Sequence, residues 1–308
     1  MEEKRKIRNY DLLSNYNWFI PNPWEIFAIL VLLLAGAMLG NAVSAVMMLA
    51  LQTSSTDILT LISYPIMFIP PMIYASFRSR RNVMFDDGMA IDGNSHFGKP
   101  GFPGCAGLVI LATLALAFLM DAVNSLMPPM PEWLESMLKG MTQGNVIINF
   151  VCVSLFAPFF EEWLCRGIVL RGLLNWRRSD ADKGNGGYGM KRPASAIVIS
   201  ALFFAFIHLN PWQAVPAFGL GCLFGYVYYR TGSLKLTMLM HFTNNTFALI
   251  AGNMDALKDV ENWLDILPVW QYAAISAICL AYLYLFIRTF NKIQLNSARG
   301  NCDVIKIM

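Results

Sequence analysis

Long apolar stretches without a charged side chain are the feature that most restricts how this chain can fold. The first extends over residues 26–51, and similar stretches recur as far as residue 287. A helix needs roughly 20 apolar residues to cross a bilayer core about 30 Å thick. Only 14% of the residues are charged, whereas a soluble chain carries about 25%. These properties indicate an integral membrane protein and exclude a disordered chain, a nucleic-acid-binding module and an ordinary soluble enzyme.

Eight such stretches predict about eight transmembrane helices and therefore an all-α, polytopic membrane fold. The predicted spans are Ile26–Leu51, Ile58–Phe77, Ala106–Met120, Asn145–Phe160, Ala194–Ile207, Trp212–Tyr229, Leu236–Ala251 and Val269–Ile287. The second span contains three prolines, so a kink is expected there. The fourth is expected to continue to about Asn175, which would carry charged residues into the membrane.

The distribution of Lys and Arg predicts the orientation of these spans. If the N-terminus is inside, 20 of the 23 basic residues fall in cytoplasmic segments, and only Lys139 and Lys258 fall in outer segments. We therefore expect both termini in the cytoplasm. The expected organisation is a cytoplasmic N-terminal segment (1–25), a single transmembrane domain (26–290) and a cytoplasmic tail (291–308). The six cysteines form no C-x-x-C pair, so no disulfide framework is expected.

Several ionisable residues fall inside these predicted spans, where such residues are rare and usually functional. They are Glu161, Glu162 and Arg166 in the fourth span, His208 at the end of the fifth, and His241 in the seventh. Glu162 and Arg166 are four residues apart and are expected to pair. Glu161 then lacks an obvious local partner, which suits a general base. The alternative is that all three form a salt-bridged helix end near the cytoplasmic surface.

Two short patterns surround the intramembrane histidines. Phe204 precedes His208 by one turn and could form a wall of its pocket, and His241 shares a helix face with Asn245. Imidazole can bind a metal or stabilise charge, and an amide can donate to an oxyanion. Each histidine could instead be an ordinary core residue. Two of the three histidines on separate spans, together with Glu161, favour one shared site, whereas His96 lies in a predicted loop.

Three motifs thus occur in order on separate spans: Glu161-Glu162-x-x-x-Arg166, Phe204-x-x-x-His208 and His241-x-x-x-Asn245. Together they resemble the motifs of the CPBP family, the CAAX prenyl proteases and bacteriocin-processing enzymes that are also called the Abi family. The resemblance covers roughly residues 145–250. It implies an intramembrane metalloendopeptidase whose catalytic core lies in spans four to seven.

The resemblance also implies roles for the motif residues. Glu161 would be the general base that activates water, with His208 beside it. His241 and Asn245 would stabilise the tetrahedral oxyanion. The supporting residues would be Glu162, Arg166 and Phe204.

A metal is an open question at this stage. The family is described as metalloproteases, but this sequence has no H-E-x-x-H motif. Glu161, His208 and His241 could supply three ligands to a divalent metal such as zinc, with a fourth position open for water. The same residues could also activate water without a metal.

The predicted function is therefore hydrolysis of peptide bonds in membrane-associated peptides or proteins, within a water-filled cavity that opens to the cytoplasm. The substrate could be of CAAX type or a leader peptide. The main alternative is a non-proteolytic immunity or regulatory protein on the same scaffold. A transporter is a third reading, against which the lack of internal repeats counts. The expected location is a prokaryotic plasma membrane, and the expected partners are the bilayer and the substrate, with no nucleic acid.

Overall fold

The computed structural model describes residues 13–52, 55–82, 90–92, 97–175, 193–257, 260 and 262–293. Every regular element within these ranges is helical, which confirms the all-α prediction. The predicted cytoplasmic segment 1–25 is described only from residue 13, and the predicted tail 291–308 only as far as residue 293. His96 lies outside the described residues.

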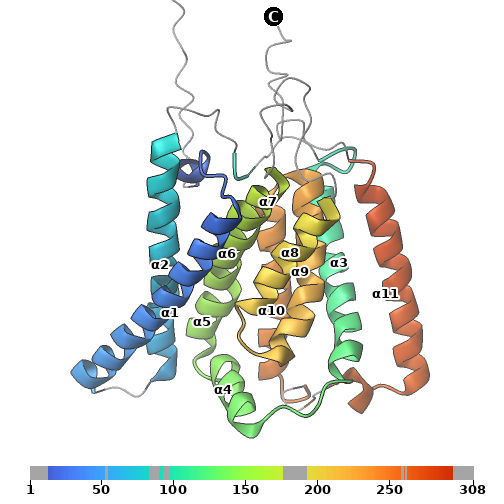
Figure 1. The fold of residues 1–308 in the computed structure, drawn as a ribbon. Helices are drawn as coiled ribbons and strands as arrows, with labels where there is room; N and C mark the ends of the chain where they lie inside the picture. Colours follow the sequence, from blue (N-terminus) through green and yellow to red (C-terminus); the bar gives the residue numbers. More distant parts are fainter. Residues whose placement is uncertain are drawn as a thin grey trace, which may run out of the picture.

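The long helices run up and down through the molecule in succession (Figure 1). In chain order the elements are η1 (Ser14–Tyr16), α1 (Pro23–Leu51), α2 (Thr56–Asn82), α3 (Gly101–Asn124), α4 (Glu132–Gln143), α5 (Val146–Asn149), η2 (Phe150–Phe156), α6 (Ala157–Glu162), η3 (Trp163–Leu170), α7 (Arg171–Asn175), α8 (Pro193–Phe206), α9 (Pro211–Thr231), α10 (Leu234–Asn253), η4 (Trp263–Asp265) and α11 (Val269–Phe290). The five elements from α5 to α7 form one continuous rod, so the predicted extension of the fourth span to Asn175 is confirmed.

Five helices of the described chain are long and apolar enough to cross a membrane. They are Pro23–Ala50, Asp57–Asn82, Gly101–Asn124, Val146–Asn175 and Val269–Phe290. The helix Pro193–Phe206 is apolar but shorter, and α10 carries the polar stretch from His241 to Asn245. The chain is thus an integral, polytopic membrane protein. All eight predicted spans coincide with helices, but the number that cross the bilayer remains a prediction.

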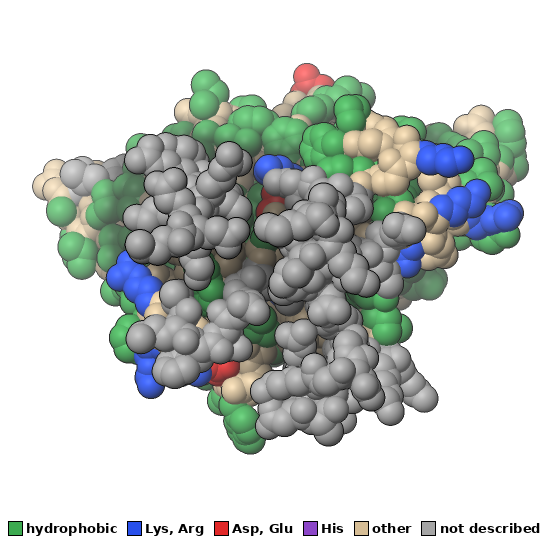
Figure 2. Space-filling model, turned by 90° about the horizontal axis from the view of Figure 1, so that it is seen from above, with side chains coloured by type: hydrophobic (Ala, Val, Ile, Leu, Met, Phe, Trp, Pro, Cys, Tyr) green, Lys and Arg blue, Asp and Glu red, His purple; other side chains and the backbone are tan. Residues whose placement is uncertain are grey.

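Basic side chains gather at one end of the bundle. The last turns of α2, α9 and α11 carry Arg80, Arg81, Arg230 and Arg288, and these turns lie at the same end, opposite to α4 (Figure 1). Figure 2 looks onto this end, and Lys and Arg side chains lie around its edge. This separation of charge is what the positive-inside rule requires. The assignment of this end to the cytoplasm remains a prediction.

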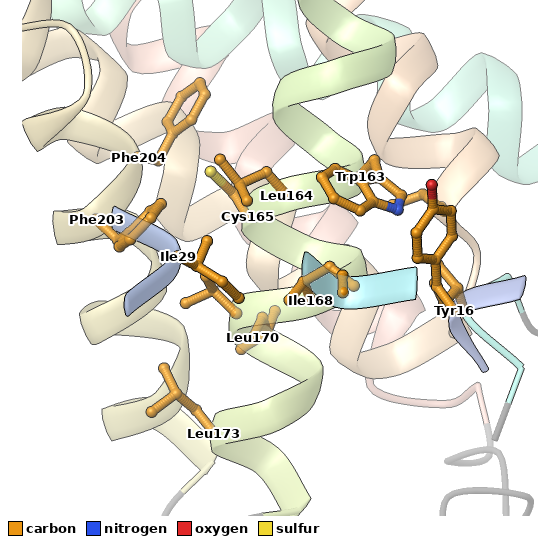
Figure 3. Packing of buried hydrophobic residues seen from close by; sticks show 14 of the residues in the cluster. Tyr16, Ile29, Trp163, Leu164, Cys165, Ile168, Leu170, Leu173, Phe203 and Phe204 are labelled. Carbon is orange, nitrogen blue, oxygen red and sulfur yellow. The ribbon is translucent and has the colours of Figure 1, made fainter. Parts of the chain in front are cut away.

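The rod from Val146 to Asn175 forms the centre of the molecule. Every residue of η3 is buried. Figure 3 shows Trp163 beside Tyr16, with their rings 5.1 Å apart and edge to face. Leu164, Ile168 and Leu170 fill the space between neighbouring helices. Arg166, the motif residue within η3, is therefore fully buried, as is Glu162, whereas Glu161 is only partly buried.

Helices α1 and α2 cross in direct backbone contact. A Cβ atom on Gly36 would lie 2.1 Å from the carbonyl oxygen of Met67, and one on Gly40 would lie 2.7 Å from that of Ser63. Small residues allow such close packing of membrane helices. Residues 63–67 of α2 are therefore held against α1 in a fixed position.

The cysteines follow the sequence prediction. The five in the described chain are all free thiols, and Cys302 lies outside the described residues. The structure therefore contains no disulfide within its described part.

Candidate active site

The first motif lies where the central rod changes its helical geometry. Glu161 and Glu162 end α6, which separates two π-helical stretches, η2 and η3. π-Helical turns within α-helices are often found at functional sites. Here they surround two adjacent carboxylates in the middle of a transmembrane segment.

Glu162 is the centre of a fully buried ion pair. Its Oε1 accepts a hydrogen bond from the Arg166 guanidinium at 2.7 Å, and both side chains have no exposed area. The pairing expected from their four-residue spacing is confirmed. Arg166 also donates to the carbonyl of Gly221 at 3.1 Å, and its guanidinium carbon lies 4.4 Å from the ring centre of Phe204. Arg166 therefore connects the first motif to α9 and to the second motif.

Glu161 has a different partner, from a helix outside the three motifs. Its Oε1 accepts a hydrogen bond from the hydroxyl of Tyr64 in α2. Its Oε2 is buried and has no hydrogen-bond partner. The two adjacent carboxylates are therefore in unlike surroundings. Glu162 is neutralised by a cation, whereas Glu161 meets a neutral hydroxyl on one oxygen and leaves the other oxygen free.

His208 lies just beyond the end of α8, in the turn before α9. Its Nδ1 is 2.8 Å from the carbonyl oxygen of Phe204. A carbonyl can only accept, so Nδ1 carries a proton, and Nε2 can accept a hydrogen bond whenever the ring is neutral. The ring of Phe204 lies 5.1 Å from that of His208, at 84°. The expectation that Phe204 forms a wall beside His208 is confirmed.

The third motif connects α10 to the central rod at two points. His241 Nδ1 lies 3.0 Å from Oε1 of Glu162, and Asn245 donates from Nδ2 to the carbonyl of Val153 at 2.9 Å. The carboxylate accepts, so His241 also carries its proton on Nδ1. Its Nε2 can then donate only when the imidazole is doubly protonated. A second N–H of the Asn245 amide remains available for another acceptor.

One large cavity brings the motifs together. It has a volume of about 1130 Å³, and most of the residues that line it are apolar. All four predicted catalytic residues line it: Glu161, His208, His241 and Asn245. Other polar residues at its wall include Tyr64, Asp121, Asn124, Asn210, Gln213 and Asn244. Glu162 and Arg166 do not line it. The structure therefore separates residues that can reach a ligand from residues that lie behind them.

The cavity extends towards the end of the bundle that carries α4. Its wall includes Met137 and Leu138 of α4 and the second half of α3, and α4 lies at the end opposite to the basic turns (Figure 1). The lining also includes Phe224, His241 and Tyr282, which lie in the halves of α9, α10 and α11 nearer the basic end. The cavity therefore spans the middle of the bundle, and its opening to the cytoplasm remains a prediction.

The suggested metal ligands do not form a metal site in this conformation. Among the described residues, no group of three or more His, Cys, Asp or Glu side chains is placed to hold a metal ion. Glu161, His208 and His241 share the cavity wall, but Glu161 is hydrogen-bonded to Tyr64 and His241 to Glu162. A zinc ion needs three side chains converging at about 2.0–2.2 Å. The side chains as they stand do not fit that requirement.

Sequence reasoning missed Tyr64. The sequence pattern of the second span predicts only an apolar, proline-kinked helix, and Tyr64 belongs to none of the three motifs. One signal was available. A tyrosine in the middle of an apolar span has a hydroxyl that needs a hydrogen-bond partner, and the partner of a buried hydroxyl is often a functional group.

The fold and the site together define an integral membrane protein with a buried glutamate, two histidines and an amide around one apolar cavity. Comparison with family models agrees with this description. Residues 143–247, about a third of the chain, match the family described as type II CAAX prenyl endopeptidase Rce1-like. The resemblance inferred from the motifs is thereby confirmed over this segment, which contains all seven motif residues. Searches of curated proteins and of solved structures gave no significant match.

Proposed function

We propose that this protein is an intramembrane endopeptidase that hydrolyses peptide bonds of membrane-associated substrates with water activated by Glu161. One observation carries the proposal. Side chains from three separate motifs line a single cavity, and one of them, Glu161, has a buried carboxylate oxygen without a hydrogen-bond partner. The Rce1-like match of the same segment supports an endopeptidase of the CAAX type in general.

In the proposed reaction, a water molecule donates a hydrogen bond to Oε2 of Glu161. The carboxylate takes a proton from this water while the oxygen adds to the carbonyl carbon of the scissile bond, which gives a tetrahedral oxyanion. The free N–H of Asn245 stabilises the oxyanion. Glu161 then delivers the proton to the leaving nitrogen as the C–N bond breaks, so the products are a carboxylic acid and an amine, and the glutamate is ionised again.

The remaining motif residues bind the water and the oxyanion or support the residues that do. The unprotonated Nε2 of His208 can accept the second hydrogen of the water. His241 can donate to the oxyanion when it is doubly protonated, and the Glu162 carboxylate at Nδ1 stabilises that charge. Glu162 and Arg166 are supporting residues behind the cavity. This reaction needs only side chains, whereas a metal step would require Glu161, His208 and His241 to move together, since they do not converge in the described part of the chain.

The charge of the cavity indicates which substrates it accepts. Its described lining contains the carboxylates of Glu161 and Asp121 and no Lys or Arg side chain. Asp121 already accepts hydrogen bonds from the backbone of Trp263 and from Tyr272. An anion entering an apolar space beside carboxylates is repelled, because charges interact strongly where water is scarce. We infer a preference for apolar segments that bring no free C-terminal carboxylate into the cavity.

A pair of peptides tests this preference. Two otherwise identical substrates, cleaved three residues from the end, would carry a C-terminal amide or a free acid. We expect kcat/KM to be about tenfold higher for the amide, a difference of about 1.4 kcal/mol. Asp121→Asn should raise the rate on the acid more than on the amide. If wild-type enzyme cleaves the free acid as fast or faster, the preference is wrong and removal of a C-terminal tripeptide is favoured.

Comparison of protein termini tests the proposed function even while the substrate is unidentified. Cells would express wild type or Glu161→Ala at matched levels, and their protein termini would be identified by mass spectrometry. New termini that occur only with wild type are the expected result, and their sequences would define the cleavage preference. If both proteins insert and no terminus differs, the non-proteolytic regulatory function becomes the better account.

A further inference from the structure

We propose that Tyr64 is a positioning residue for Glu161, whose hydroxyl holds one carboxylate oxygen so that the other faces the water to be activated. The inference rests on the proposed function. It concerns a helix that the family match does not include, since α2 lies outside residues 143–247. No motif of the central rod, α8 or α10 contains this residue.

The Tyr64 hydroxyl contacts one oxygen of the Glu161 carboxylate. Among the described residues, the Tyr64 hydroxyl is the one hydrogen-bond donor to the Glu161 carboxylate. A glutamate side chain has broad freedom about its last torsion, so a single fixed oxygen sets the plane of the carboxylate. The other oxygen, Oε2, is then directed by the protein and not by solvent. Both Tyr64 and Glu161 line the cavity, so the contact lies at its wall.

The ring of Tyr64 is held independently of its hydroxyl. It packs 5.6 Å from the ring of Phe68, which stacks on Phe160 at 5.0 Å and 15°. Phe160 directly precedes Glu161 in α6. On the neighbouring face of α2, about 100° around the helix, the backbone of Ser63 and Met67 approaches the glycines of α1 closely. These contacts fix the position of the ring, so a phenylalanine at position 64 would occupy the same space without the hydroxyl.

Loss of the hydroxyl should therefore affect the chemical step and not substrate binding. In Tyr64→Phe, the Glu161 carboxylate can rotate, and misplacement of a reacting group by about 1 Å can cost on the order of 10²-fold in rate. We expect kcat to fall roughly 10- to 100-fold while KM changes by less than about twofold. A substrate-binding role would instead raise KM, which would overturn the proposal.

Tyr226→Phe is the matched control. This variant also loses a hydroxyl that joins two helices, because the Tyr226 hydroxyl donates to the carbonyl of Ile287 in α11 at 3.2 Å. Tyr226 does not line the cavity. This variant should keep the wild-type kcat and KM. An equal fall of kcat in both variants would mean that the loss of any interhelical hydroxyl impairs the enzyme, and a positioning role of Tyr64 would be excluded.

An infrared measurement tests the contact without any substrate. The carboxylate band of Glu161 is identified by its disappearance in Glu161→Gln. It should change frequency in Tyr64→Phe and stay unchanged in Tyr226→Phe. An unchanged band in Tyr64→Phe would refute the contact. The two failures are distinguishable: a wild-type protein without cleavage activity contradicts the proposed function, whereas active wild type with an equally active Tyr64→Phe contradicts only this inference.

Discussion

Glu161→Gln is expected to lower kcat by roughly 10²- to 10⁴-fold, the range contributed by a general base. The amide keeps the shape of the side chain, and its oxygen can still accept the Tyr64 hydroxyl. It cannot take a proton from water. Insertion and folding should be unchanged, because Glu161 takes no part in the buried ion pair, which is formed by Glu162 and Arg166. The measurement is single-turnover cleavage by purified protein on a substrate identified from cellular termini.

Glu135→Gln provides the control for the Glu161 experiment. Glu135 lies on α4, pairs with Lys139 at 2.6 Å and is partly exposed. Glu135→Gln makes the same chemical change at a residue that does not line the cavity. The kcat of this variant should therefore equal that of wild type. Wild-type activity in purified Glu161→Gln would show that another residue activates the water, and the proposed mechanism would have to be abandoned.

Arg166→Met should have the largest effect on stability, about 3–5 kcal/mol less free energy of unfolding. The substitution removes the cation from a pair without any exposed area, and Glu162 is left as a buried charge with only His241 beside it. It also removes the hydrogen bond to the carbonyl of Gly221. Reversible unfolding of detergent-solubilised protein, titrated with a denaturing detergent, would measure the difference.

Two further variants distinguish the effect of an unpaired buried charge on stability from the effect of removing a long side chain. Lys139→Met breaks an exposed pair with the same spacing, Glu135 and Lys139, and should cost only about 0.3–0.5 kcal/mol. The double variant Glu162→Gln, Arg166→Met leaves no unpaired charge and should be more stable than Arg166→Met alone. If the double variant is the less stable of the two, the unpaired carboxylate is not the cause of the loss.

Local sequence was sufficient for much of the architecture. The predicted spans coincide with helices because apolar stretches of this length have few other ways to satisfy their backbone in lipid. The Glu162–Arg166 pair and the contact of Phe204 with His208 were also predictable, since each joins residues one helical turn apart. Contacts within one turn depend on helix geometry alone.

Contacts between distant parts of the chain were decided only by the tertiary structure. His241 bonds to Glu162 across 79 residues and Tyr64 to Glu161 across 97, and no local spacing encodes either contact. The same is true of the cavity, which is assembled from helices throughout the chain, from α1 to α11. The sequence by itself determined the membrane class, the helices and the three motifs. Packing between helices determined which carboxylate is neutralised and which one faces the cavity, because those outcomes depend on how helices far apart in the sequence come together.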